Sequence, residues 1–131
     1  MLQRDYSFLS LAAALALMSS WSQLASAAGG DVAAGRAAFA KCASCHQVGP
    51  SARGGFGPQL NGVIGRRAGS TADFKYSSAM ASANFIWTEE RLRAFMKSPD
   101  DVVPGNKMRF WGIGSERQRD DILAYLRSTT R

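Results

Sequence analysis

Five consecutive residues could bind a cofactor covalently. Cys42-Ala43-Ser44-Cys45-His46 forms a C-x-x-C-H pattern. Two thiols separated by two residues can each add to one vinyl group of a haem, and the histidine that follows can then reach the iron from the same side. The pattern therefore predicts one covalently attached haem c, with thioether bonds to Cys42 and Cys45 and with His46 as an axial iron ligand.

Other uses of this cysteine pair fit the chain less well. A structural zinc site needs four ligands, mostly Cys and His, but the whole sequence has two cysteines and one histidine. A thioredoxin-like redox pair expects an α/β context, and no strand pattern is visible. A disulfide between these two cysteines would close a very small loop and constrain the unfolded chain little. Haem attachment is the favoured interpretation.

A methionine is the expected second axial ligand, because the chain has no second histidine and haem proteins of this kind often use methionine. Met96 lies on the apolar stripe of a predicted helix and is expected in the core. Met80 lies among small residues, and its role stays open. Met108 follows a Pro-Gly turn on a loop far enough along the chain to cover the other haem face. The sequence therefore favours Met108.

The first residues have the pattern of a secretory signal peptide. An apolar run from Phe8 to Met18 follows Arg4 and precedes Ala25-Ser26-Ala27, an A-x-A cleavage pattern. The run is shorter than the roughly 20 residues that span a bilayer, although an uncleaved membrane anchor is the alternative. We expect cleavage of residues 1–27 and export of a domain over residues 28–131 to the periplasm, without stable membrane insertion.

The chain is basic, with 16 Lys and Arg against 10 Asp and Glu and a net charge of +6. Such a charge favours nucleic acid, a membrane surface or an acidic protein as partner. Export and the scattered positions of the basic residues argue against nucleic acid. We therefore expect a monomer that docks on protein redox partners with acidic surfaces.

The elements that must position these residues are predicted to be helices. They are a helix that Asp31 caps and that runs through Val32, Phe39 and Lys41, a short helix over 76–82, a helix that Thr88 caps and Pro99 ends, and a last helix that opens with Ser115-Glu116-Arg117-Gln118. A glycine-rich segment over 49–75 and a loop over 100–114 have no regular period. Loops this long are unusual, and wrapping around a cofactor would explain them. The predicted class is all-α.

These landmarks together resemble class I cytochrome c, in the mitochondrial and bacterial cytochrome c2 branch, over residues 30–130. The motifs that carry the resemblance are GDVAAG, CASCH, FGPQLNGVIGRRAG, PGNKMRFWGI and ILAYLR. The resemblance implies three main helices, short helices and long loops wrapped around one haem. It also implies that Gly35 and Phe39 of the first helix cross Tyr125 and Leu126 of the last.

The resemblance further assigns residues to the haem environment. Pro58 matches the proline whose carbonyl accepts the N–H of the proximal histidine, a bond that would orient His46 and raise its basicity. The remaining matches are Arg66, Tyr76 and Trp87 near the propionates, Asn106 in the haem environment, and Lys41 and Lys107 in a basic ring around the exposed haem edge.

Two positions depart from the family pattern. Phe95 stands where a tyrosine is common, and Met80 stands where an asparagine is common. Both changes remove hydrogen-bonding groups beside the haem. They predict a drier pocket and an iron–Met108 bond that is harder to displace at high pH.

Ligation by both His46 and Met108 would close the iron to substrates, which implies a monohaem one-electron carrier and not an enzyme. The donor and acceptor stay open among a cytochrome bc1-type complex, an oxidase, a reaction centre and a dehydrogenase. One alternative is a dedicated electron-accepting subunit of a periplasmic dehydrogenase. Another is an open-site haem enzyme or sensor, which would require Met108 to be labile.

Overall fold

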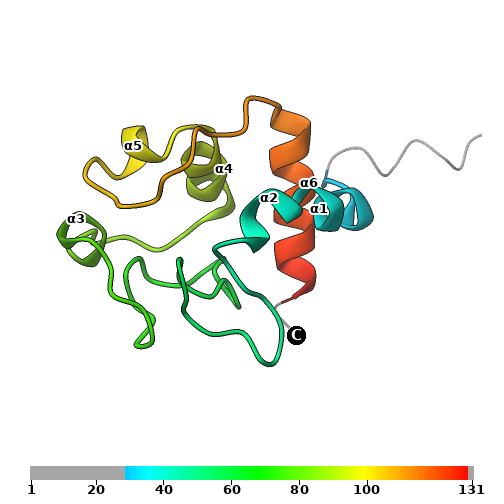
Figure 1. Cartoon of the computed structure of the whole chain (residues 1–131). Coiled ribbons are helices and arrows are strands. Elements are labelled where there is room, and N and C mark those ends of the chain that lie inside the picture. The colour runs from blue at the N-terminus through cyan, green and yellow to red at the C-terminus, as the bar shows by residue number, and fades with distance from the viewer. Residues whose placement is uncertain (1–28, 130–131) are drawn as a thin grey trace, which may run out of the picture.

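The computed structural model describes residues 29–129, which form helices joined by long loops (Figure 1). The helices are α1 (Val32–Ala38), α2 (Ala40–Ala43), α3 (Ser78–Ala81), α4 (Glu89–Lys97), α5 (Pro99–Val102) and α6 (Glu116–Ser128). Across these residues the only β pairing is an isolated antiparallel bridge between Arg67 and Ile86. The all-α class is therefore confirmed. The predicted signal peptide, residues 1–27, lies outside the described residues.

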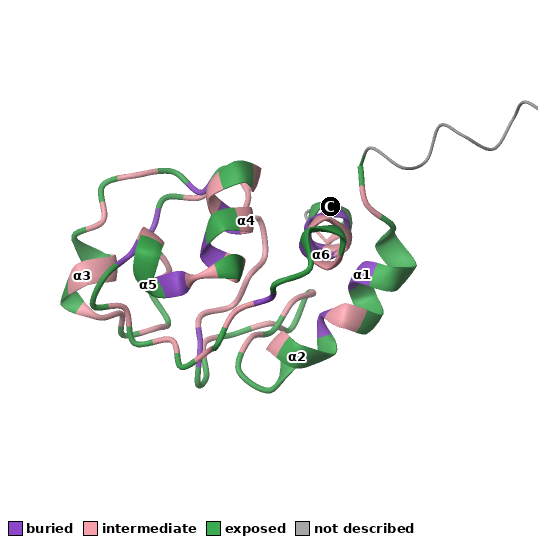
Figure 2. Ribbon diagram, turned by 90° about the horizontal axis from the view of Figure 1, so that it is seen from above, coloured by how far each residue is buried: buried purple, intermediate pink, exposed green. Residues whose placement is uncertain are grey.

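The first and last long helices cross in close contact, and Figure 2 shows α1 beside α6. A Cβ atom at Gly35 would lie 1.8 Å from the backbone oxygen of Asp121, so only glycine fits there. The rings of Phe39 and Tyr125 pack with centroids 5.3 Å apart. The Asp31 carboxylate accepts a hydrogen bond from the backbone N–H of Ala34, which caps α1. The predicted crossing and cap are confirmed.

The first predicted helix is interrupted. Instead of running through Phe39 to Lys41, it ends at Ala38, and α2 begins at Ala40. The N–H of Cys42 donates to the Phe39 oxygen at 2.8 Å, three residues back, which tightens the turn. The break coincides with the burial of the Phe39 ring, which is 6% exposed. As a result, the first cysteine lies on a separate short helix.

Helix α4 forms as predicted and packs against α6. The Thr88 hydroxyl accepts a hydrogen bond from the backbone N–H of Arg91, and Leu92 and Phe95 are buried. Two ion pairs join α4 and its cap region to α6: Arg93 with Asp120 at 2.6 Å, and Glu89 with Arg127 at 2.7 Å. Both pairs are partly exposed, so each contributes little stability.

The predicted loop over 100–114 is only partly irregular, because its first residues belong to α5. Pro99 ends α4 and also occupies the first turn of α5, where a missing N–H is harmless and the fixed φ suits a helix. The rest of the segment, 103–114, is irregular as predicted. The short helix expected over 76–82 is α3, capped by the Ser77 hydroxyl.

Backbone hydrogen bonds fasten the glycine-rich segment to the strand-like stretch before α4. Trp87 donates to the Arg66 oxygen at 2.9 Å and accepts from Gly65 at 2.7 Å, while Ala68 donates to the Phe85 oxygen at 2.9 Å. The segment contributes Leu60 and Val63, and α6 contributes Leu126, to the lining of a common space. A cavity lies between them.

Candidate haem site

The cavity is walled by α4, α6 and the loops, and contains about 960 Å³ of space including its open mouth. Most of its wall is apolar, and the large apolar side chains include Leu60, Val63, Trp87, Leu92, Phe95 and Leu126. A bulky apolar cofactor fits such a space.

The C-x-x-C-H motif forms one turn at the edge of this cavity. The N–H groups of Cys45 and His46 both donate to the Cys42 oxygen, at 3.0 and 2.8 Å. Cys42 and His46 line the cavity, whereas Cys45 is exposed and is not part of the lining. The structure thus brings one of the two thiols to the cavity wall together with the imidazole.

The imidazole of His46 is held by the segment that follows the motif. Its Nδ1 donates to the carbonyl oxygen of Pro58 at 2.8 Å. Because a carbonyl can only accept, the proton is on Nδ1, and Nε2 keeps its lone pair for a metal. A Cβ atom at Gly57 would lie 2.6 Å from Cε1 of the His46 ring, so the ring packs directly on glycine backbone.

Burial shifts the pKa of the two motif residues that line the cavity, His46 and Cys42. It lowers the pKa of His46, an effect that the Pro58 hydrogen bond opposes and the charge of Arg66 reinforces. The imidazole is therefore kept neutral, as ligation requires. Burial also raises the pKa of the Cys42 thiol, and nearby Lys41 partly offsets this.

Met108 lines the same cavity from the segment after α5. Its backbone N–H donates to Oδ1 of Asn106 at 2.9 Å, and the Asn106 amide donates to Oδ1 of Asp100 at 2.8 Å and to the Val103 oxygen at 3.0 Å. Asn106 therefore ties the methionine to α5. Asn106 was expected near the haem only from the family resemblance.

Four other residues predicted around the haem also line the cavity: Arg66, Tyr76, Trp87 and Lys107. Lys41, predicted in the same basic ring, does not line it and donates instead to Oε1 of Gln118 at 3.0 Å. Arg66 donates to the backbone oxygens of Asn61 at 2.9 Å and Gln59 at 2.8 Å, and burial lowers its pKa. The Tyr76 hydroxyl lies 2.6 Å from Oγ1 of Thr71. The Trp87 indole packs edge-on against Phe95, with centroids 5.1 Å apart.

Sequence reasoning missed part of the lining. Met96, expected in the core, packs against the core and also faces the cavity, as does Met80, whose role was open. Phe56 at the cavity rim is 89% exposed, and the sequence did not predict its place there. The contact of Gly57 with the His46 ring was also not predicted, although Gly57 directly precedes Pro58, whose carbonyl was expected to bind His46.

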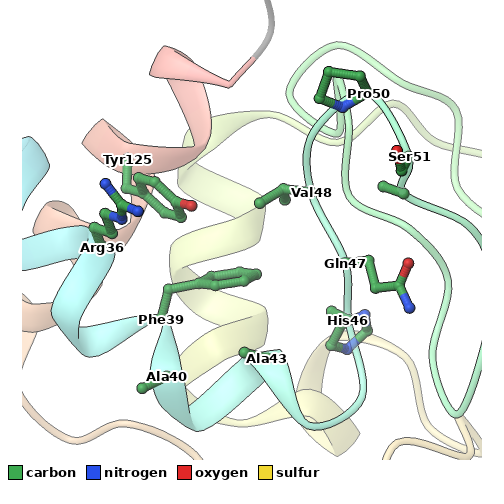
Figure 3. A pocket seen from close by; sticks show the side chains of 11 residues that line it. Arg36, Phe39, Ala40, Ala43, His46, Gln47, Val48, Pro50, Ser51 and Tyr125 are labelled. Atoms are coloured by element: carbon green, nitrogen blue, oxygen red, sulfur yellow. The ribbon is translucent and has the colours of Figure 1, made fainter.

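A second pocket lies between the crossing of α1 with α6 and the chain that follows the C-x-x-C-H motif (Figure 3). Phe39 and Tyr125 from the helix crossing form one end, and the chain from His46 to Ser51 forms the other. It contains none of the methionines and does not include Cys42. The haem chemistry therefore belongs to the first cavity.

The donor set of the first cavity suits a haem. It offers a thiol for a vinyl group, a neutral imidazole nitrogen and a thioether sulfur, within apolar walls. Clusters of three or more His, Cys, Asp or Glu that could hold a bare metal ion are absent from residues 29–129. The residues present therefore fit a covalently bound haem.

Comparisons with known proteins agree with this site. The family model for cytochrome c matches residues 32–130. The chain is 47% identical over 100 residues to a cytochrome c2 of Agrobacterium tumefaciens (strain II Chrys), covering 74% of this chain and 90% of the relative. It is 45% identical to a cytochrome c2 of Rhodoblastus acidophilus, over 74% of this chain and 91% of that protein.

A solved structure is also similar. Cytochrome cH from Methylobacterium extorquens superimposes with a TM-score of 0.71 at 41% identity, covering 76% of this chain and 99% of that one. Family model, relatives and fold coincide. The chain therefore belongs to the cytochrome c family, in its bacterial cytochrome c2 branch, and carries one covalently bound haem c.

Proposed function

We propose that this electron-carrying cytochrome is a soluble periplasmic shuttle, whose haem is attached through Cys42 and Cys45 and whose iron is ligated by His46 and Met108. The observation that carries the proposal is the presence of a thiol, an imidazole and a thioether in the wall of one apolar cavity. The haem, when bound, supplies an iron that changes its charge by one electron.

The imidazole of His46 would hold the iron through Nε2. Its Nδ1–H is already committed to the Pro58 oxygen at 2.8 Å, which fixes the ring orientation and makes Nε2 a better donor. The absence of a side chain at Gly57 lets the ring reach this position. Cys42 and Cys45 would add the covalent attachment on the same side.

Met108 would supply a second protein ligand to the iron through its thioether sulfur. A thioether favours the reduced iron and raises the potential. Occupation of both positions by protein ligands would leave none for a substrate and would keep the coordination the same in both oxidation states. The apolar wall would exclude water from the ligands, and Arg66, which lines the same cavity, would provide a positive charge for the carboxylates of a bound haem.

The proposed location is the periplasm, since the expected leader over residues 1–27 directs export. Within residues 29–129, none of the helices has the length and apolar character needed to cross a bilayer. The net charge of +6 favours acidic protein partners and makes their association dependent on salt. Donor and acceptor would be redox proteins of the membrane or the periplasm.

Absorption spectra of the haem-loaded protein, oxidised and reduced, with and without carbon monoxide, test the proposal. We expect a low-spin spectrum with the weak long-wavelength methionine–iron band, unchanged by carbon monoxide after reduction. A high-spin spectrum, or a shift with carbon monoxide, would indicate an open iron and favour an enzyme or sensor. Stable co-purification with a single dehydrogenase would instead indicate a dedicated subunit.

A further inference from the structure

The segment that carries Met108 exposes alternate side chains. Lys107, Arg109 and Trp111 are exposed, whereas Met108 and Phe110 are partly buried and pack against the core. One short segment therefore places a thioether at the haem cavity and two cations and an indole in solvent. Any protein that approaches this segment meets those three side chains.

Trp111 contributes no burial to the fold. Its side chain is 103% exposed, whereas the other tryptophan in the described residues, Trp87, is 6% exposed. Burial of the apolar surface of an exposed indole in an interface is favourable, and tryptophan is enriched among the residues that dominate interface energies. Phe56, on the rim of the haem cavity, is a second exposed aromatic side chain.

The charges beside Trp111 select the partner. Arg109 and Lys107 are both exposed. The ammonium group of Lys107 lies 4.6 Å from the centroid of the Phe74 ring and donates to the backbone oxygen of Lys75, so its charge is fixed in place. An apolar side chain next to fixed positive charge complements an apolar pocket with a carboxylate rim.

We infer that Trp111 is the apolar anchor of the docking surface for an acidic redox protein, inserting into a pocket on that protein while residues 107 and 109 contact its carboxylates. The inference rests on the proposed electron-carrier function. A lipid surface suits the segment less well, because stable membrane binding needs a broad apolar face or several anchors, and this segment exposes one indole. The anchor sets partner affinity and leaves the iron ligands unchanged.

The test uses haem-loaded wild type, Trp111→Ala and Trp111→Phe with respiratory membranes of the source bacterium. Both the oxidation of reduced cytochrome and the reduction of oxidised cytochrome by substrate-supplied membranes are followed against cytochrome concentration. We expect Trp111→Ala to raise KM about tenfold with little change in kcat, and Trp111→Phe to recover part of the loss. The reduction potential and the methionine–iron band should stay as in wild type. Val32→Ala, which shortens an exposed apolar side chain on α1, is the matched control and should leave KM unchanged.

Each outcome is distinguishable. Equal KM values for wild type and Trp111→Ala, with electron transfer intact, would overturn the anchor but leave the carrier function standing. A wild-type protein that the membranes neither oxidise nor reduce would remove the proposed function and the inference with it. Co-sedimentation with vesicles of phosphatidylglycerol and phosphatidylcholine provides the last comparison. Binding by wild type that Trp111→Ala loses would assign the indole to a lipid surface and overturn the protein-docking inference.

Discussion

The side-chain oxygen of Asn106 accepts a hydrogen bond from the backbone N–H of Met108 at 2.9 Å. Its amide group donates at the same time to Asp100 and Val103. One side chain thus connects the proposed iron ligand to the end of α5. The position of the thioether therefore depends on a local network of hydrogen bonds.

Replacement of Asn106 by Ala should loosen Met108. Each lost hydrogen bond is worth about 1 kcal/mol, so we expect the pH at which base displaces the methionine to fall by about one unit. The measurement is the intensity of the methionine–iron band during an alkaline titration. Asn84→Ala, at an exposed position, is the control. An unchanged midpoint in Asn106→Ala would show that the network does not hold the ligand.

Arg119 fixes the other end of the segment that carries Met108. It is 6% exposed, and its Nη1 donates to the oxygens of Ile113 at 2.5 Å and Gly114 at 2.9 Å. Arg119→Met leaves both oxygens without this donor, at an expected cost of about 2 to 4 kcal/mol in unfolding free energy. Denaturant unfolding measures it, with exposed Arg117→Met on the same helix as the control. Equal stability of Arg119→Met and wild type would refute the role.

Gly35→Ala tests the crossing of α1 and α6. In an open helix, alanine would stabilise by about 1 kcal/mol relative to glycine. Here the new Cβ would lie 1.8 Å from the Asp121 oxygen, so the helices must separate, and overpacking of this kind costs about 1 to 3 kcal/mol. We expect a net loss in thermal unfolding experiments. The matched variant is Gly55→Ala, where a Cβ would meet nothing within 4 Å. A stabilised Gly35→Ala would contradict the observed contact.

The features that the sequence predicted correctly depend on interactions between residues that are close together along the chain. The caps at Asp31, Thr88 and Ser115 and the stop at Pro99 depend on neighbouring residues, and all were predicted correctly. The interruption at Phe39 was not predicted, because a continuous helical pattern in the sequence does not reveal where a helix is broken.

The same limit applies to the site. The C-x-x-C-H motif and Met108 could be proposed from residue type and spacing. The contact of Gly57 with the His46 ring depends on how two chain segments pack. Leu60 and Val63 reach the cavity from a segment without any period, so no local pattern could have placed them there.

Acid should destabilise the protein through His46. Burial lowers its pKa below the ordinary value of 6.5, so the folded protein binds fewer protons at this site than the unfolded chain. Stability from the neutral imidazole is therefore complete above about pH 6.5 and is lost as the pH falls toward the folded pKa. Iron ligation acts in the same direction, because only the neutral ring can bind the metal.

We expect the unfolding free energy of the haem-loaded protein to decrease as the pH falls below about 6.5. His46 is the only histidine in the chain, and carboxylates titrate mainly near pH 4. The titration of His46 is therefore separated in pH from that of the carboxylates. Denaturant unfolding at pH 7, about 6 and about 5 measures it. A constant unfolding free energy over that range would contradict the assignment.

Phe95 and Met80 contribute apolar side chains to the wall of the cavity. Both line it; Phe95 is 8% exposed and packs against the Trp87 indole, and neither side chain offers a hydrogen bond as strong as a hydroxyl or an amide would. In the double variant Phe95→Tyr, Met80→Asn, polar groups would enter an apolar wall and favour water beside the iron. Because water and hydroxide help to displace the methionine, we expect the alkaline transition of the double variant to lie below that of wild type.

The measurement is the methionine–iron band as the pH is raised. Met80→Leu keeps the wall apolar at similar volume and should leave the midpoint close to wild type. A double variant whose midpoint equals or exceeds that of wild type would show that dryness does not protect the iron–Met108 bond.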